Sequence, residues 1–327
     1  MRNLFARLHG NRRLYGTLQV VALAIVLGFL GYAFRGSWAD AEPRLRSASL
    51  VDLGIATALL AAYYLLFVAG WMRILAAYEI QVPYRIALRA EMLSMLAKYV
   101  PGGVWTPAAR VVAMRRAGVT DTPKVLASVL LEAGLSAVSG VLVFVASLSA
   151  VNDVNTSLLP LLGFAALCAI LLHPRVFRRL ARRVFRPFGA SEVPALPYRT
   201  MVYLLMYYSF TWLVGGAALY FLIRSVGEDP GVAVIPFLGG VSAVGAIVAV
   251  LSIIAPSGLG VREASMYGLM LAVASSGAAL GATVLNRVTI TLVEAALLLG
   301  GMLVWRLRMG KARAPERLTD GEAPART

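Results

Sequence analysis

Long apolar segments are the feature of this chain that most restricts its fold. Apolar runs of about 20 residues, the length of a membrane-spanning helix, recur along the sequence. Only 14% of the residues are charged, against about 25% in an average soluble domain. The apolar residues follow one another without the alternation of polar residues that the strands of a membrane barrel would need. We therefore expect an all-α, polytopic integral membrane protein.

The apolar runs predict about eight crossings, of which the run 264–283 is the least apolar. The runs lie near residues 16–34, 53–77, 125–149, 157–172, 200–223, 235–255, 264–283 and 285–305. The first run follows a basic leader, as in a signal peptide, but it exceeds the roughly 7–15 apolar residues of such a peptide. We therefore expect it to remain as an uncleaved helix. Residues 1–310 would form a single transmembrane domain, and the polar residues 311–327 a disordered cytoplasmic tail.

Lysine and arginine in the links predict the orientation of the chain, because positive loops stay in the cytoplasm. The N-terminal leader, the links 73–124 and 175–186 and the start of the tail are basic, whereas links 151–157 and 225–231 contain no Lys or Arg. Both termini are therefore expected in the cytoplasm, which requires an even number of crossings. The link 175–186 is also suited to lie on anionic lipid headgroups. The net charge of +15 comes from these short links, so we expect no nucleic-acid partner.

The stretch KYVPGGVWTPAARVVAMRRAGVT, residues 98–120, interrupts the apolar pattern. Residues 92–100 predict a half-length helix, and the Pro-Gly-Gly at 101–103 predicts a break. Residues 106–118 predict a second short helix with Pro107 in its first turn. Because the segment enters and leaves on the cytoplasmic side, we expect a re-entrant hairpin.

A second interruption lies in IIAPSGLGVREASMYGLML, residues 253–271. One proline and two glycines break the run, and Arg262 with Glu263 opens the following helix. In one arrangement residues 235–275 make two full crossings, and the break lies near the cytoplasmic surface. In the other they form a hairpin that dips from the outside, with Arg262 and Glu263 near mid-membrane. Both satisfy the charge rule, and the second places one broken segment on each face, as in inverted-repeat transporters.

Broken backbone and charge coincide in both interrupted segments. Unwound backbone at membrane depth is tolerated only where it is buried in protein or lines water. A helix that begins there directs its free N–H groups and the positive end of its dipole at an anion such as phosphate. Glycines allow such an anion to approach the backbone closely. The alternative explanation of each break alone is a packing kink.

Charged residues also lie inside apolar runs, at Glu132, Arg287 and Glu294. Each costs about 2.5–3.5 kcal/mol at a helix centre, so each is expected to pair or to face water. Internal ion pairs that fix helix packing are one explanation, and Glu132 is a candidate partner for a cation from another helix. A cationic site is the other explanation, because positive charge remains after each glutamate has neutralised one cation.

We expect the two interrupted segments to meet at a cationic site that binds a phosphate-bearing headgroup. The predicted substrate-binding residues are Lys98, Pro101, Gly102, Gly103, Arg110, Glu132, Pro256, Gly258, Gly260, Arg262, Glu263 and Arg287. The basic residues of this set would bind the headgroup. Glu132 and Glu263 would hold these cations in the empty site or carry a coupling proton.

Neither a cofactor nor a metal is expected. Cys168 is the single cysteine, and His9 and His173 lie far apart in the sequence, so no metal-ligand pattern is present. The chain also lacks a P-loop. If transport is coupled to an energy source, we therefore expect that source to be an ion gradient.

Four segments together resemble the lysylphosphatidylglycerol synthase transmembrane-region family: KYVPGGVWTPAARVVAMRRAGV, ASVLLEAGLS, APSGLGVREASMYG and LNRVTITL. The resemblance covers roughly residues 15–306 and is most specific in the stretch from Pro256 to Glu263 and in the Pro-Gly-Gly segment. Glu132 and Arg287 are similar to family positions as well. The resemblance implies a flippase-like domain that moves or presents an amphipathic lipid. The aminoacyl-transferring domain of the full-length synthases would follow the last helix, where this chain has only a short polar tail, so lysyl transfer is not expected.

The expected function is a lipid flippase in the bacterial cytoplasmic (inner) membrane, with no enzyme activity. Its cargo would be an anionic amphipathic lipid, either a phospholipid or a lipid-linked intermediate, so its partners are membrane lipids. One alternative is a membrane-embedded transferase on a lipid-linked substrate, but no D-x-D pair or histidine lies near the breaks. The other alternative is a non-catalytic partner of a lipid-modifying enzyme.

Overall fold

The computed structural model describes residues 38–97, 105–148, 196–252 and 258–312, with side chains as far as residue 301, and scattered residues between 151 and 183. All regular structure in these parts of the chain is helical. Five stretches are long and apolar enough to span a membrane, which confirms the expected all-α, polytopic class. They are Leu50–Ala77 (α3), Thr122–Ser147 (α6), Tyr198–Ser225 (α9), Val232–Leu251 (η3, Val232–Val234, with α10, Ile235–Leu251) and Ser276–Gly301 in α12. The predicted crossing 16–34 and most of 157–172 lie outside the described residues.

The predicted crossing 264–283 is wrong. Its residues are divided between α11 (Val261–Met270) and α12 (Ser276–Ala312). Ser275 separates the two helices: its Oγ accepts a hydrogen bond from Ala278 N–H at 3.4 Å, and its own N–H donates to Glu228 Oε1 at 2.7 Å. These bonds fix the start of α12 where the apolar pattern alone shows no boundary.

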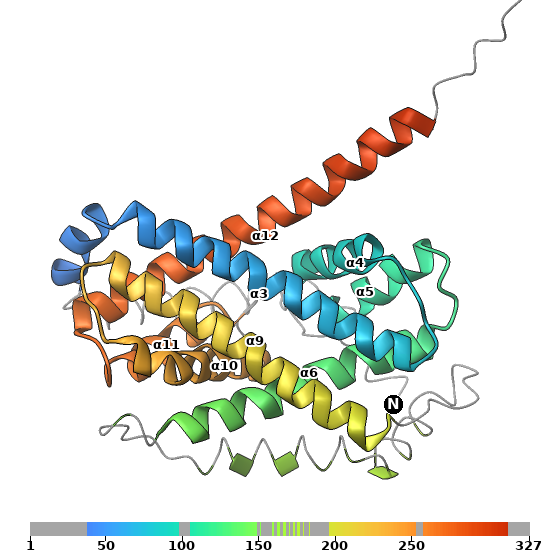
Figure 1. The fold of residues 1–327 in the computed structure, drawn as a ribbon, viewed down its shortest axis with the longest axis horizontal. Coiled ribbons are helices and arrows are strands. Elements are labelled where there is room, and N and C mark those ends of the chain that lie inside the picture. The colour runs from blue at the N-terminus through green and yellow to red at the C-terminus, as the bar shows by residue number, and fades with distance from the viewer. Residues whose placement is uncertain are drawn as a thin grey trace, which may run out of the picture.

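The first interrupted segment forms two short helices on either side of the predicted break. α4 (Tyr84–Ala97) begins earlier than the sequence indicated, and α5 (Trp105–Arg116) carries Pro107 in its first turn, as predicted. α5 ends where Gly118 adopts φ 91° and Val119 N–H donates to Met114 O at 3.1 Å, the left-handed termination that favours glycine. α4 and α5 pack against each other (Figure 1).

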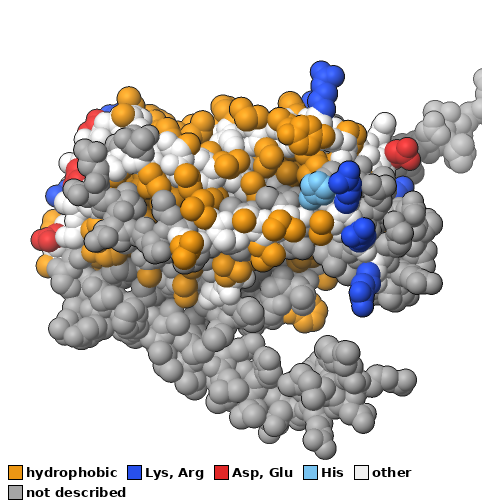
Figure 2. Space-filling view, turned by 90° about the horizontal axis from the view of Figure 1, so that it is seen from below, with side chains coloured by type: hydrophobic (Ala, Val, Ile, Leu, Met, Phe, Trp, Pro, Cys, Tyr) orange, Lys and Arg blue, Asp and Glu red, His pale blue; other side chains and the backbone are white. Residues whose placement is uncertain are grey.

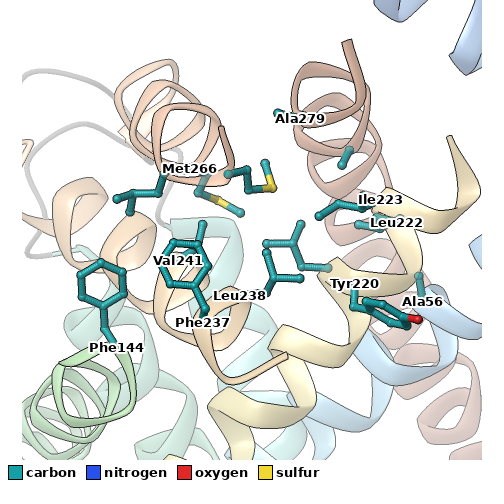
Figure 3. Packing of buried hydrophobic residues seen from close by; sticks show 14 residues of the cluster. Ala56, Phe144, Tyr220, Leu222, Ile223, Phe237, Leu238, Val241, Met266 and Ala279 are labelled. Carbon is teal, nitrogen blue, oxygen red and sulfur yellow. The ribbon is translucent and has the colours of Figure 1, made fainter. Parts of the chain in front are cut away.

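The second interrupted segment folds α11 back along α10. Gly258 and Gly260 have φ values of 64° and 86°, a region that favours glycine. A Cβ at Gly258 would overlap Ala249, and one at Gly245 would lie 2.7 Å from Met266 Cγ. The end of α11 packs against the start of α10, as Figure 3 shows for Met266 and its neighbours Val241, Leu238 and Phe237. α10 and α11 therefore form an antiparallel hairpin held by close contacts at small residues.

Eight of the described helices fall into two sets with the same order, a long helix, two shorter ones and a long helix. The first set has α3, α4, α5 and α6 with 28, 14, 12 and 26 residues, and the second has α9, α10, α11 and α12 with 28, 17, 10 and 37. Ser49 N–H, at the start of α3, donates to Ser225 O at the end of α9 at 2.8 Å. α3 and α9 therefore run in opposite directions. In Figure 1 α10 and α11 lie toward the end where α3 begins, and α4 and α5 toward the end where it finishes.

The surface of the bundle is apolar between its two ends. Large hydrophobic side chains such as Met206, Leu292 and Leu142 are exposed by 69%, 62% and 54%. Figure 2 shows this apolar surface on one face, with Lys and Arg side chains gathered mainly at one end of the described part. A wide apolar belt with basic residues beyond it is the surface expected of a helical bundle in a bilayer.

Candidate functional site

Arg110 is buried at the junction of four helices, with an exposure of 3%. Its guanidinium forms ion pairs with Glu91 of α4 and Glu132 of α6, and these glutamates are exposed by 1% and 2%. The Trp71 ring of α3 lies against the guanidinium, 4.5 Å from ring centroid to Cζ. The expected cation for Glu132 is thus Arg110. We call Glu91, Arg110 and Glu132 the buried triad.

Neighbouring side chains fix the position of the buried triad. Trp71 Nε1 donates to Ser128 Oγ of α6 at 2.9 Å, which sets the plane of the ring beside Arg110. Gly70 leaves room for Tyr208 of α9, since a Cβ at Gly70 would lie 2.8 Å from Tyr208 Oη. The Tyr208 hydroxyl lies within electrostatic range of Glu132 and Arg110. The buried triad is therefore enclosed by α3 and α9 as well as by its own three helices.

The buried triad is incompletely satisfied. Within the described residues, Glu91 Oε1, Glu132 Oε1, Arg110 Nε and Tyr208 Oη are buried without a hydrogen-bond partner. Two ionised carboxylates and one guanidinium would leave one excess negative charge. Uncompensated charge in the interior is costly, so this cluster needs a further cation or proton to be neutral.

A second ion pair lies at the start of α11. Glu263 Oε1 is 3.3 Å from Arg287 Nη1 of α12, and Glu263 Oε2 accepts a hydrogen bond from Gly260 N–H at 2.6 Å. One carboxylate thus caps α11 and joins it to α12. The side chains of Glu263 and Arg287 are 15% and 23% exposed, so this pair is more accessible than the buried triad.

Arg262 differs from Arg110 and Arg287 because no described carboxylate lies within 4.0 Å of its guanidinium. The residue is half-buried and lies within electrostatic range of Tyr63 and Tyr64, at the centre of α3. Its charge is therefore uncompensated by the described residues. Such a cation is available for an anionic ligand.

Two tyrosines of α3 lie between the charged groups. The Tyr64 hydroxyl donates to Glu294 of α12, whose exposure is 8%. Tyr63 lies within electrostatic range of both Arg262 and Glu132, and in the described parts of the chain its hydroxyl has no hydrogen-bond partner. The centre of α3 thus connects the surroundings of the buried triad with the start of α11.

The predicted site residues form two groups. Arg110 and Glu132 belong to the buried triad, whereas Gly258, Gly260, Arg262, Glu263 and Arg287 form the turn and ion pair at the start of α11. Lys98, Pro101, Gly102, Gly103 and Pro256 lie outside the described residues. The short helices α5 and α11 begin directly after the predicted breaks, at Trp105 and Val261.

Sequence reasoning missed Glu91, Trp71, Tyr64 and Tyr208. Glu91 carried a usable signal, because it stands among apolar residues in the stretch AEMLSML, as Glu132 does in its own helix. The aromatic residues carried none, since nothing local distinguishes them from lipid-facing or packing residues. Elsewhere among the side chains that the structure describes, no three His, Cys, Asp or Glu residues are placed to hold a metal ion.

Comparison with known proteins gives one family. The family described as the lysylphosphatidylglycerol synthase TM region matches residues 19–300 of this chain. None of the curated proteins matches the chain. The matched range includes both interrupted segments and all five candidate spans nearly completely.

Proposed function

Because this chain belongs to the lysylphosphatidylglycerol synthase transmembrane-region family, we propose that it is a translocator that moves an anionic amphipathic lipid across the bacterial cytoplasmic membrane. The family supports a membrane function related to lipids, and the five candidate spans establish a multi-pass protein. In this proposal the chain binds and moves a phospholipid or a lipid-linked intermediate and catalyses no reaction.

The uncompensated charge of Arg262 is the observation that carries this proposal. A cation that is half-buried among apolar helices is costly without a partner, and a phosphate group would supply one. The first turn of α11 adds backbone N–H groups and the positive end of the helix dipole at the same place. In this proposal Arg262 binds the phosphate of the headgroup, and Arg287 joins it after leaving Glu263.

The length of α11 supports a re-entrant hairpin in the second interrupted segment. The 10 residues of α11 rise about 15 Å, half of the roughly 30 Å of the hydrocarbon core. Ser275 is tied to Glu228 in the α9–α10 connection, so both ends of the segment 235–275 lie at the same end of the bundle. Both arrangements meet that condition, so it is the short length of α11 that favours the hairpin over two full crossings, with Arg262 and Glu263 deep in the membrane.

The two sets of helices support an inverted repeat. Each set has a long helix, a hairpin of shorter helices and a second long helix, and the first helices of the two sets run antiparallel. The α4–α5 hairpin would enter from the cytoplasm and the α10–α11 hairpin from the outside, with both termini in the cytoplasm. In this proposal, broken helices that enter from both faces would serve one transport path, as alternating access requires.

The proposal is tested with purified protein in liposomes that contain a fluorescent phosphatidylglycerol. Protein-dependent exposure of the inner-leaflet probe to an external, membrane-impermeant quencher is expected. Arg262→Gln removes the charge-assisted bond to the phosphate, worth about 1.5–3 kcal/mol, so we expect transport to fall by about 10- to 100-fold. Folding should be retained, because Arg262 has no described carboxylate to leave unpaired.

Arg116→Gln is the matched control, since Arg116 is an exposed arginine at the end of α5. It should transport the probe at the wild-type rate. Wild-type transport by the Arg262 variant would remove Arg262 from the site. An inner-leaflet probe that stays inaccessible with wild-type protein would contradict the translocator and favour a non-catalytic partner of a lipid-modifying enzyme.

A further inference from the structure

The buried triad contains one more carboxylate than its single cation can neutralise. Glu91 and Glu132 both pair with Arg110, and no second cation lies within 4.0 Å of either carboxylate in the described parts of the chain. Each glutamate also keeps one buried oxygen, Oε1, without a hydrogen-bond partner among the described residues. Geometry and charge both indicate a missing positive species.

Among the described residues, the side chains that face the buried triad do not supply this positive charge. α3 contributes the neutral rings of Trp71 and, farther away, Tyr63, and α9 contributes Tyr208. Tyr208 can donate one hydrogen bond to Glu132 but brings no charge. The remaining group that the structure describes there is Arg110 of α5, which is already shared by the two carboxylates.

We propose that Glu91 and Glu132 together bind one proton, and that exchange of this proton accompanies lipid movement. The proton adds to one carboxylate oxygen and converts that carboxylate into a carboxylic acid, so no other bond is made or broken. The product is one ionised carboxylate beside Arg110 and one neutral acid, with no net charge. Two carboxylates in one buried site commonly share a single proton for this reason. The link between proton exchange and lipid movement rests on the proposed translocator function, whereas the shared proton itself does not.

Burial links proton exchange to movement of the helices. Glu91, Arg110 and Glu132 are exposed by only 1%, 3% and 2%, so water reaches the pair only when packed helices separate. Glu91 and Arg110 lie on the two arms of the α4–α5 hairpin, whereas Glu132 lies on the long helix α6. Loss of the proton restores the excess charge and favours a hydrated, open arrangement, and its return favours the closed one.

Infrared spectroscopy of purified protein tests the proton site without any transport assay. At pH 7, where free carboxyl groups are ionised, wild-type protein is expected to show a protonated-carboxyl band. Glu91→Gln and Glu132→Gln should each abolish the same band, because the glutamate that remains is neutralised by Arg110. The double variant should lose no more than either single variant.

Glu294→Gln is the matched control, since Glu294 is another buried glutamate in a spanning helix. It should leave the shared component of the band intact. Additive losses in the double variant, or no loss in either single variant, would contradict a shared proton. Because two independent variants report on one band, misfolding of one of them still leaves a test.

The link to transport is tested with the fluorescent phosphatidylglycerol probe in liposomes with an imposed pH gradient. One proton per lipid predicts a bias in the leaflet distribution of up to about tenfold per pH unit in the wild type, and no bias in Glu91→Gln or Glu132→Gln. Probe movement that ignores the gradient in the wild type would overturn the coupling and leave the translocator standing. A wild type that moves no probe would overturn the translocator, while the infrared band would still decide the proton site.

Discussion

Arg110 connects three helices of the bundle through its side chain. It joins the hairpin arm α5 to α4 and α6 through Glu91 and Glu132, and it rests on the Trp71 ring. A buried ion pair adds little net stability when it is complete, but removal of one partner leaves a buried charge unpaired. The stability of this region therefore depends on the balance of charges within the buried triad.

Arg110→Ala is expected to lower the free energy of unfolding by about 3–5 kcal/mol, because it leaves two carboxylates in the interior. Thermal unfolding of the purified variant in detergent measures this loss. The triple variant Arg110→Ala/Glu91→Gln/Glu132→Gln removes the orphaned charges and should recover much of the stability. An Arg110→Ala protein as stable as the wild type would show that the ion pairs are dispensable.

At the scale of elements, glycines set how closely the helices approach one another. A Cβ at Gly239 of α10 would lie 2.6 Å from Trp212 O and 3.1 Å from Trp212 C, both in the backbone of α9. Backbone atoms in a packed helix cannot move aside cheaply. The contact between α9 and α10 therefore requires a residue without a side chain at this position.

Gly239→Ala should separate α9 from α10 and destabilise the protein by about 1–3 kcal/mol, the usual cost of overpacking. Gly54→Ala is its control, because a Cβ at Gly54 in α3 would meet no atom within 4 Å. Gly54→Ala should be neutral or stabilise α3 by up to about 1 kcal/mol. Equal unfolding temperatures for the two variants would mean that α9 and α10 tolerate a wider spacing.

The sequence predicted the helices and breaks that follow from the local pattern of apolar, proline and glycine residues. It missed the helix boundaries and contacts that residues far apart in the chain create. The spans and the two breaks follow from apolar runs and from Pro and Gly residues, and the structure has helices beginning directly after both breaks. The boundary between α11 and α12 was missed because a contact of Ser275 with Glu228, 47 residues earlier, fixes it. The Tyr64–Glu294 bond, which joins residues 230 positions apart, was missed for the same reason. Glu91 is different, because a lone charge among apolar residues was visible in the local sequence.

At the scale of the whole molecule, the two sets of helices carry their charged pairs with opposite polarity. The first set places the cation on the short helix and the anion on the long one, as Arg110 and Glu132. The second set places the anion on the short helix and the cation on the long one, as Glu263 and Arg287. In each set, one ion pair therefore joins the second short helix to the long helix that follows it: Arg110–Glu132 joins α5 to α6, and Glu263–Arg287 joins α11 to α12.

Cysteine labelling of vesicles tests the proposed inverted repeat, starting from a Cys168→Ser background. Thr120→Cys, exposed in the link before α6, and Val232→Cys, at the exposed first residue of η3, should react with an impermeant maleimide from the cytoplasmic and the outer side, respectively. Ser252→Cys, at the end of α10, should react far more slowly from the cytoplasm than Thr120→Cys, because a hairpin ends inside the membrane. Equal cytoplasmic labelling of these two positions would instead indicate two full crossings.

The ion pair between Glu263 and Arg287 also orders the assembly of the chain during its synthesis. α11 is short and carries Arg262 and Glu263, so it cannot enter the hydrocarbon core by itself. Its partner Arg287 lies in α12, which leaves the ribosome later. The long helices before it can insert as they emerge, whereas α11 must wait at the membrane surface until α12 arrives. A ribosome that stalls before α12 would therefore leave a chain whose last hairpin remains exposed to membrane quality-control proteases.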